Sequence, residues 1–371
     1  MKVKIIFAVS ALISCLLFQS CQSAQNHLLL AGGYTGPGEK GLNIFDFNSN
    51  SGELTLLSQN DVGPNPSYFC FSAQNKLLYV ANEITESDGK DGGALSTFRY
   101  NPGNSSLEKQ GEISIPYGGT CFISMSPDSG YLFLANYPKG SVVVVKLDNK
   151  GLPETIADTI LYVKGAPEVS HAHMIMNDPS GRKIYVTDLG QDMIFRYDFN
   201  SETGKLMPFD TLFVPKGEGP RHFDFNKEGS RLYIINELGS KIIVFSVSDK
   251  PEIIQTISTV KEGFKGKTFC ADLHLSSDGK YLYGTNRGEN SIATFAVQPD
   301  GTLKPAGNSS CGGNWPRNFT IDPLGNFILV ANQRSDSIAV FRIDRGTGLI
   351  SPLQQKYFMK SPACLKFVSF R

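Results

Sequence analysis

The sequence predicts an all-β fold, a seven-bladed β-propeller with four antiparallel strands in each blade. Three observations support this prediction. A strand–turn–strand pattern recurs six times at intervals of about 50 residues, the two chain ends hold complementary parts of one further copy, and long amphipathic helical windows are absent. The 37 glycines and 20 prolines fit a fold with many turns, and the 25 phenylalanines and 14 tyrosines suit strands.

The repeat is centred on an apolar, aromatic strand that ends in Asn or Asp. The six terminal residues are Asn82, Asn136, Asp188, Asn236, Asn286 and Asn332. A third strand follows most copies, as at 240–245, 291–295 and 337–341, and a Gly-x-Leu turn then leads to a fourth, as at 204–206 and 301–303. Four short strands in roughly 50 residues are typical of a propeller blade.

The seventh blade is expected to combine the two ends of the chain. Residues 27–34 resemble a second strand that lacks a first, with 42–47 and 54–57 as its third and fourth strands. Residues 361–368 resemble a first strand with nothing after it. Pairing of the N-terminal strands with this C-terminal strand closes the ring and removes exposed sheet edges. The sequence therefore predicts one domain over residues 26–371, and an eight-bladed ring would need a blade that the even spacing does not contain.

Residues 1–21 have the features of an export signal. Lys2 and Lys4 precede an apolar stretch over 5–17, which is too short for a membrane-spanning helix. Ser20 followed by Cys21 resembles a bacterial lipobox, in which the cysteine takes the lipid; Cys15 is a second candidate, and a secretory signal without lipid is the alternative. We expect an exported protein, a periplasmic or outer-membrane-attached lipoprotein whose contact with the membrane is the lipid anchor alone.

The overall composition excludes some classes of partner. The 35 basic and 35 acidic residues give a formal net charge of zero, and there is no long basic run, so nucleic acid is not an expected partner. The mature chain has no Cys-x-x-Cys pair, so a zinc site is not expected. No cofactor is predicted. Buried free thiols are the expected state of its five cysteines, which are Cys70, Cys121, Cys270, Cys311 and Cys364.

The starts of the first strands are the predicted functional site. In a propeller these starts converge at one mouth of the central channel, where several blades can direct side chains at one ligand. Four of the five histidines and the single tryptophan fall in this position; they are His171, His173, His222, His274 and Trp315. A structural role for all four histidines is the alternative.

Charged residues beside the strand ends add to this site. Glu83, Glu237 and Arg287 follow second strands and do not recur in every copy, whereas the terminal Asn or Asp of each repeat is expected to be scaffold. Arg221 and Arg317 occupy equivalent positions, each after a proline. The two guanidiniums are suited to clamp a phosphate or carboxylate, or to form ion pairs with Glu83 and Glu237, and both roles remain open.

Four motifs in blade order resemble those of the 6-phosphogluconolactonase-type lactonase family. They are 170–173 with 188–192, 219–222 with 236–238, 271–274 with 286–287, and 315–319. The resemblance implies a seven-bladed propeller and, because the family includes bacterial 6-phosphogluconolactonases, the hydrolysis of a sugar lactone. The family also includes fungal enzymes that cyclise carboxymuconate to a lactone. This chain has Val169 and Ser170 where the family often has proline. Its export signal also favours an unphosphorylated or differently substituted lactone over 6-phosphogluconolactone.

Lactone hydrolysis needs a base for water, a donor for the oxyanion and a proton source for the ring oxygen. The hypothesis assigns the base to Glu237 or His222, the oxyanion donor to Arg287 or His274, and the proton source to His173. Arg221 and Arg317 would hold an anionic group such as a phosphate. His171 and Glu83 would make further contacts with the substrate.

Three alternatives remain from the sequence. The same residues suit the reverse, lactone-forming reaction of a cycloisomerase. A non-catalytic propeller that binds a glycan or peptide is possible because fold does not fix function. A calcium site would recruit Glu83, Asp188 and Asn236, but the histidines and arginines at the mouth disfavour a cation, so no metal is expected.

Overall fold

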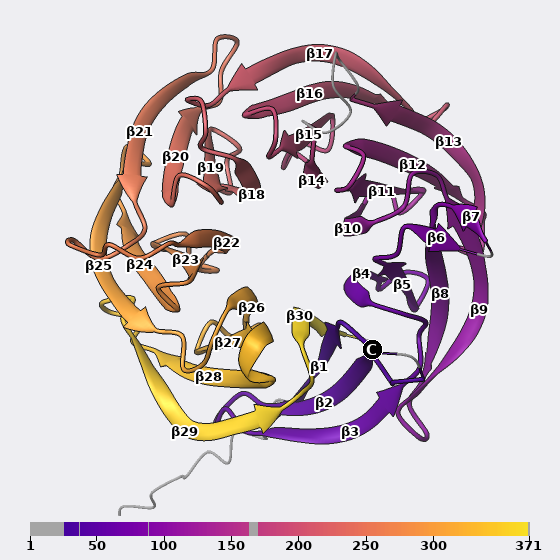
Figure 1. Cartoon of the computed structure of the whole chain (residues 1–371), viewed down its shortest axis with the longest axis horizontal. Coiled ribbons are helices and arrows are strands. Elements are labelled where there is room, and N and C mark those ends of the chain that lie inside the picture. Colours follow the sequence, from indigo (N-terminus) through magenta and orange to yellow (C-terminus); the bar gives the residue numbers. More distant parts are fainter. Residues whose placement is uncertain (1–25, 37, 88, 163–169, 370–371) are drawn as a thin grey trace, which may run out of the picture.

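The structure, a computed structural model, describes residues 26–369 except residues 37, 88 and 163–169. Seven four-stranded antiparallel sheets are arranged in a ring around a common axis, as Figure 1 shows, which confirms the predicted propeller. The predicted signal segment with Cys15 and Cys21 lies outside the described residues, as does Val169. Among the described residues no helix is long and apolar enough to cross a membrane.

We number the blades in chain order from the first complete sheet and describe each from the channel outward. Blade 1 is β4 (Pro66–Ser72), β5 (Leu77–Asn82), β8 (Gly93–Asn101) and β9 (Ser106–Ile115). Blade 2 is β10 (Thr120–Met125), β11 (Tyr131–Asn136), β12 (Ser141–Leu147) and β13 (Pro153–Leu161). Blade 3 is β14 (Ala172–Asn177), β15 (Lys183–Asp188), β16 (Met193–Asn200) and β17 (Lys205–Phe213).

The remaining blades follow the same order. Blade 4 is β18 (Pro220–Phe225), β19 (Arg231–Asn236), β20 (Lys241–Ser246) and β21 (Glu252–Ser258). Blade 5 is β22 (Phe269–Leu275), β23 (Tyr281–Arg287), β24 (Ser291–Val297) and β25 (Leu303–Ser310). Blade 6 is β26 (Pro316–Ile321), β27 (Phe327–Asn332), β28 (Ser337–Ile343) and β29 (Ile350–Phe358). Blade 7 is β30 (Pro362–Val368), β1 (Asn26–Gly33), β2 (Leu42–Asn48) and β3 (Leu54–Asn60).

The ring closes in blade 7 as predicted. The C-terminal strand β30 pairs antiparallel with the N-terminal strand β1, with Leu28 opposite Val368 and Ala31 opposite Leu365. Both edges that an open ring would expose are therefore paired within one sheet.

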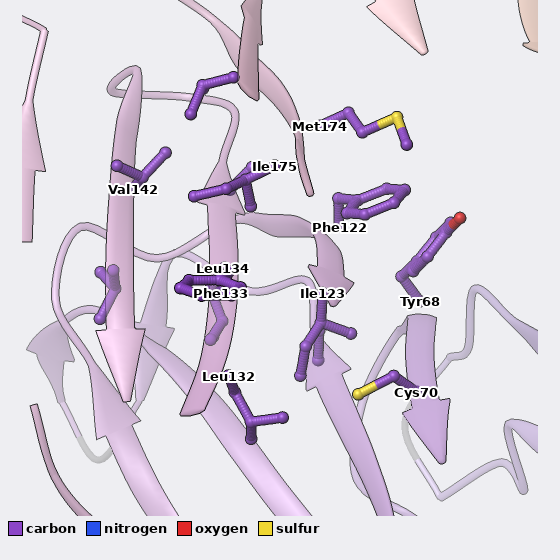
Figure 2. Close-up of a cluster of buried hydrophobic side chains, with 14 of the residues drawn as sticks. Tyr68, Cys70, Phe122, Ile123, Leu132, Phe133, Leu134, Val142, Met174 and Ile175 are labelled. Atoms are coloured by element: carbon purple, nitrogen blue, oxygen red, sulfur yellow. The ribbon is translucent and has the colours of Figure 1, made fainter. Parts of the chain in front are cut away.

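The core lies between the faces of neighbouring blades. Every residue of the second strands β5, β11 and β27 is buried, whereas most residues of the outermost strands β3 and β13 are exposed or only partly buried. Figure 2 shows Cys70, Phe122 and Ile123 of blades 1 and 2 packed in one such cluster with Ile175 of blade 3. Burial of apolar side chains from adjacent blades is the main force that holds the ring together.

The repeated Asn at the end of the second strand is structural, as predicted for the scaffold. Asn82 is fully buried, and its Nδ2 donates hydrogen bonds to the carbonyls of Val62 and Pro64 at 3.0 and 2.9 Å. Asn286 and Asn332 make the same kind of bond to the carbonyls of Thr259 and Cys311. Each amide thus ties the segment that enters a first strand to the second strand of its own blade.

The first strands carry a β-bulge near the channel mouth. The pairing of the first strand with the second skips one residue in blades 1, 2, 3, 4 and 6; these residues are Ser67, Cys121, His173, Arg221 and Arg317. In blade 5 both Ala271 and Asp272 lie between the paired positions. A bulge leaves its extra residue outside the ladder and redirects the side chain. Three predicted site residues, His173, Arg221 and Arg317, are bulge residues.

The structure departs from the predicted elements in a few places. β22 begins at Phe269, two residues before the 271–274 motif, because β23 extends to Arg287 and pairs with Phe269. The connection between β5 and β8 contains a short hairpin, β6 (Glu86–Ser87) and β7 (Lys90–Asp91), and a 3₁₀ turn, η1 (Gln333–Ser335), follows β27. The five cysteines of the described residues are free and buried, as expected.

Candidate active site

Glu237 lies at the centre of the charged cluster at the mouth. It follows β19 of blade 4, and its backbone carbonyl accepts a hydrogen bond from Cys270 N of blade 5 at 3.1 Å. Its Oε2 lies 2.9 Å from Arg221 Nε and 2.6 Å from Arg287 Nη2. One carboxylate oxygen therefore bridges guanidiniums from two blades. No contact to Glu237 Oε1 is found among the described residues, and this oxygen remains available to a ligand.

The two guanidiniums keep Glu237 ionised. Burial alone would raise the pKa of Glu237, but the positive charges of Arg287 and Arg221 lower it below its ordinary value. Burial and the nearby Arg221 lower the pKa of Arg287 to about 10, so this guanidinium still carries its charge at neutral pH.

Backbone carbonyls of blade 5 fix the two arginines. Arg221 Nη1 donates to the carbonyl of Ala271, and Arg287 Nη2 donates to the carbonyl of Cys270 at 2.8 Å. The Arg221 side chain is 2% exposed. These bonds leave little freedom for either guanidinium, so the ion-pair role proposed from the sequence is realised at Glu237.

Arg317 forms a second charged group with Glu83. Arg317 Nη2 lies 4.0 Å from Glu83 Oε2, and the Tyr34 hydroxyl donates to the same oxygen at 2.7 Å. The Arg317 guanidinium also lies over the Tyr34 ring, 5.3 Å from its centroid. The Arg317 and Glu83 side chains are 18% and 21% exposed, so both reach the surface of the mouth.

His173 and His222 form a buried pair below these charges. Their ring centroids are 5.1 Å apart in an edge-to-face arrangement. Burial and the charge of Arg221 lower the pKa of His222 to about 4, although Asp272 acts in the opposite direction. Burial, followed by the charge of Arg221, also lowers the pKa of His173 well below its usual range. Both rings are therefore neutral at physiological pH.

The two other histidines lie apart from Glu237. His171 stacks on Tyr137 with ring centroids 4.4 Å apart, and its Nδ1 lies 3.0 Å from the Tyr137 carbonyl oxygen. His274 contacts Asp272 and packs edge-on against Phe319 at 4.9 Å. The described contacts thus place neither histidine against Glu237 or Arg287, which leaves Arg287 as the better-placed of the two oxyanion donors considered from the sequence.

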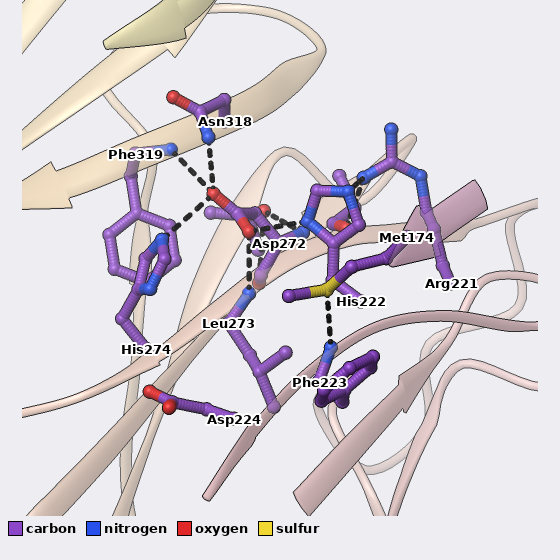
Figure 3. A network of polar contacts seen from close by, with 12 residues as sticks. Met174, Arg221, His222, Phe223, Asp224, Asp272, Leu273, His274, Asn318 and Phe319 are labelled. Atoms are coloured by element: carbon purple, nitrogen blue, oxygen red, sulfur yellow. Dashed lines mark hydrogen bonds and ion pairs between the residues drawn. The ribbon is translucent and has the colours of Figure 1, made fainter. Parts of the chain in front are cut away.

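Asp272 is the polar residue that the sequence reasoning missed. It is 1% exposed, and Figure 3 shows side chains from three blades directed at its carboxylate. His222 Nδ1 lies 2.7 Å from Oδ1, and Oδ2 contacts His274 Nε2 at 3.2 Å and Asn318 Nδ2 at 2.5 Å. A buried aspartate in a first strand was the available signal, but two of its partners, His222 and Asn318, are about 50 residues away in sequence.

The residues considered for calcium lie in separate environments. The Asp188 carboxylate accepts hydrogen bonds from Ser170 Oγ and from the backbone N–H of His171, so it organises its own loop. Asn236 Nδ2 donates to the carbonyls of Ile234 and Lys241, and Glu83 accepts from Tyr34. Across the described ranges no group of three or more His, Cys, Asp or Glu side chains is arranged to hold a metal ion.

The cavities show where a ligand has room. One cavity of about 570 Å³ lies at the opposite face between blades 4 and 5, and its polar lining includes Asp224 and Asp278 rather than the charged cluster. At the mouth, a crevice of about 10 Å³ is lined by Ser67, Arg221, His222 and Arg317, which is space for about one water molecule. A hollow of about 270 Å³ beside it shares Tyr34 with the Arg317–Glu83 group. We take the mouth as the candidate site because the charged groups from several blades converge there.

Comparison with known proteins agrees with this architecture. The family model described as "Lactonase, 7-bladed beta-propeller" matches residues 28–367. A 6-phosphogluconolactonase of Formosa agariphila is 30% identical over 341 residues, which cover 89% of this chain and 96% of that protein. The structure of a periplasmic gluconolactonase of Pseudomonas aeruginosa superposes with a TM-score of 0.86 at 32% identity and covers 93% of this chain and 100% of that one.

A putative 6-phosphogluconolactonase of Bacteroides fragilis is similar to the same extent, with a TM-score of 0.83 at 30% identity over 93% of this chain and 98% of that one. The family match extends across all seven blades and includes the closing strand pair. The chain belongs to the lactonase family of seven-bladed β-propellers.

Proposed function

We propose that the protein hydrolyses a sugar lactone at the channel mouth, with Glu237 as the base. The single observation that carries this proposal is the Glu237 carboxylate held between Arg221 and Arg287, because it places an ionised base beside two fixed positive charges. Relatives named 6-phosphogluconolactonase and periplasmic gluconolactonase support lactone hydrolysis as the reaction class.

In the proposed reaction Glu237 Oε1 takes a proton from a water molecule as the water oxygen attacks the lactone carbonyl carbon. The carbonyl oxygen becomes an oxyanion, which the Arg287 guanidinium stabilises, since its Nη1 has no hydrogen bond among the described residues. The bond between the carbonyl carbon and the ring oxygen then breaks. Glu237 returns the proton to the ring oxygen, and the product is a hydroxy acid that ionises in water.

This proposal changes the role of two histidines. A neutral imidazole is a poor proton donor, and the lowered pKa of His173 makes it neutral, so we assign it a hydrogen bond to the substrate instead of protonation of the alkoxide. His222 is more buried than Glu237, with 5% against 17% of the side chain exposed. We therefore assign the base to Glu237 and keep His222 as a neighbour of Arg221.

The charges at the mouth favour an unphosphorylated lactone. Arg221 and Arg287 already face Glu237, and Arg317 faces Glu83. A phosphate would have to compete with these carboxylates for the guanidiniums, at the energetic cost of leaving a partly buried carboxylate unpaired. The hydroxyl groups of a neutral sugar ring need no such exchange.

The test is a rate measurement on the purified protein. Hydrolysis of glucono-δ-lactone and of 6-phosphogluconolactone is followed by base uptake in a pH-stat, and the spontaneous rate is subtracted. We expect enzyme-dependent turnover of both, with the higher kcat/KM for the unphosphorylated lactone. Failure of every lactone to react faster than in buffer would overturn the proposal and favour a propeller that only binds its ligand.

A further inference from the structure

We propose that Asp272 is a positioning residue for the Glu237 site: it fixes the tautomer of His222, and His222 in turn keeps Arg221 in place against Glu237. This inference rests on the proposed lactone hydrolysis and adds a residue that does not touch the substrate. It concerns the network in Figure 3, in which His222, His274 and Asn318 meet at the Asp272 carboxylate.

The Asp272 carboxylate is surrounded by hydrogen-bond donors. Besides the side chains of His222, His274 and Asn318, the backbone N–H groups of Leu273 and Phe319 donate to it at 3.1 and 3.2 Å. A buried carboxylate with this many donors is stable only in its ionised form. Asp272 is therefore a fixed negative charge in the interior of the propeller.

That charge determines which nitrogen of His222 carries the proton. Nδ1 lies 2.7 Å from the Asp272 carboxylate and must donate, because a lone pair there would face a negative charge. Nε2 lies 3.5 Å from Arg221 Nη1 and must present its lone pair, because an N–H there would face another N–H donor. Both ends of the ring select the same neutral tautomer.

The neutral tautomer matters because His222 is a neighbour of Arg221. A protonated His222 would place a second positive charge 3.5 Å from the guanidinium that contacts Glu237. The ring is also packed edge-on against Phe122 and Tyr68, with centroids 5.4 and 6.3 Å apart, so it is confined on its apolar sides. Asp272 thus acts on Glu237 through two intervening side chains.

Charged groups on the neighbouring strands also act on His274 and His222. His274 of β22 faces Asp272 and is influenced by Asp224 of β18 and Lys366 of β30. Burial disfavours the charged form of His274, but the attraction and hydrogen bond of Asp272 raise its pKa above the ordinary value. Arg221 of β18 and His274 both lower the pKa of His222, in addition to burial.

A purely structural role is the competing explanation, because Asp272 also joins blades 4, 5 and 6. We separate the two with a matched control. Asp322 is 2% exposed and accepts backbone N–H bonds from Leu324, Asn326 and Phe327. Asp322→Asn therefore also removes the charge of a buried carboxylate and weakens its hydrogen bonds, but Asp322 has no described contact with Arg221 or Glu237.

The experiment compares Asp272→Asn with Asp322→Asn and the parent protein, with rates normalised to the folded fraction from circular dichroism. We expect Asp272→Asn to lower kcat by about 10-fold or more with KM within about 2-fold, and Asp322→Asn to lower Tm without lowering kcat. Histidine ¹⁵N NMR of the parent should show His222 protonated on Nδ1 alone, and Asp272→Asn should lose this pure tautomer. An unchanged kcat, or an unchanged His222 tautomer, in folded Asp272→Asn would overturn the proposal.

A second variant covers the case in which Asp272→Asn does not fold. His274→Gln keeps an N–H donor for Asp272 but removes an imidazole whose charged form lowers the pKa of His222, so protonation of His222 becomes easier. The pH at which His222 takes up a second proton, followed by ¹⁵N NMR, should then move to higher values, and an unchanged titration of His222 would contradict its dependence on this network. If the parent protein hydrolyses no lactone, the proposed function fails, whereas the NMR measurement still tests the tautomer.

Discussion

Arg287 Nη2 of blade 5 lies 2.6 Å from Glu237 Oε2 of blade 4, so the carboxylate and its guanidinium partner come from different blades. Arg221 of blade 4 contacts the same oxygen, so the cluster joins blades 4 and 5 at the mouth. Since the ring fixes the blades relative to one another, these groups are held in place before a substrate binds, which is a requirement for stabilising an oxyanion.

Loss of the Arg287 guanidinium should lower turnover more than binding. In Arg287→Met we expect kcat to fall by roughly 10²- to 10³-fold, because the oxyanion loses its donor. Arg334→Met is the control, since Arg334 is exposed and stacks on Trp315, 3.4 Å from the ring centroid. Steady-state kinetics on one lactone check the prediction, and equal rates for the two variants would contradict it.

Removal of the Glu83 charge should change substrate preference. Glu83→Gln frees Arg317 from its carboxylate neighbour at 4.0 Å, so a phosphate can engage the guanidinium. We expect kcat/KM for 6-phosphogluconolactone, relative to that for glucono-δ-lactone, to rise by up to about 10-fold. The two substrates are compared in the same preparation, and an unchanged ratio would show that Arg317 does not meet the phosphate.

The buried histidines should make the fold sensitive to acid. The pKa of His222 is lowered to about 4 in the folded protein, against about 6.5 for an unfolded chain. Between these values the unfolded state binds more protons, so the free energy of unfolding falls as pH drops from about 6.5 to about 4. His173 acts in the same direction, and the raised pKa of His274 in the opposite one.

Urea unfolding at several pH values measures this effect. The slope of the free energy of unfolding against pH should be smaller in His222→Gln than in the parent over this range. A parental slope in His222→Gln would mean that the acid sensitivity arises elsewhere in the chain.

The buried asparagines should each contribute to stability. Asn82→Ala leaves the carbonyls of Val62 and Pro64 without their donor, which should cost about 1–3 kcal/mol in the free energy of unfolding. Asn50→Ala, in an exposed turn, is the matched control and should change stability by less than about 0.5 kcal/mol. Thermal and urea unfolding provide the measurement. Similar losses of stability in both variants would argue against a stabilising role of the Asn82 hydrogen bonds.

The sequence predicted the architecture because the repeat is local. The predicted strand ends at Asn82, Asn136 and Asn332 are the last residues of β5, β11 and β27, and the halves of blade 7 were recognisable from the missing strands at each end. The β6–β7 hairpin occurs in one blade only, so no repeat could reveal it.

The site was only partly predictable. Glu237, Arg221 and Arg287 were identified from their positions beside strand ends, and the structure brings them into contact. The roles of His274 and Asp272 depend on contacts between blades and on a bulge that moves residues out of the ladder. Periodicity along one strand does not contain this information, because a bulge shifts which side chain faces the channel.

The most direct test of the account is the turnover of glucono-δ-lactone by Glu237→Gln, an isosteric change that removes the base. Asp210→Asn serves as the control, because it weakens a remote ion pair with Arg196 on the outer part of blade 3. We predict that Glu237→Gln lowers kcat by at least about 10²-fold while Asp210→Asn keeps the parental rate. Parental turnover in folded Glu237→Gln would contradict the assignment of Glu237 as the base.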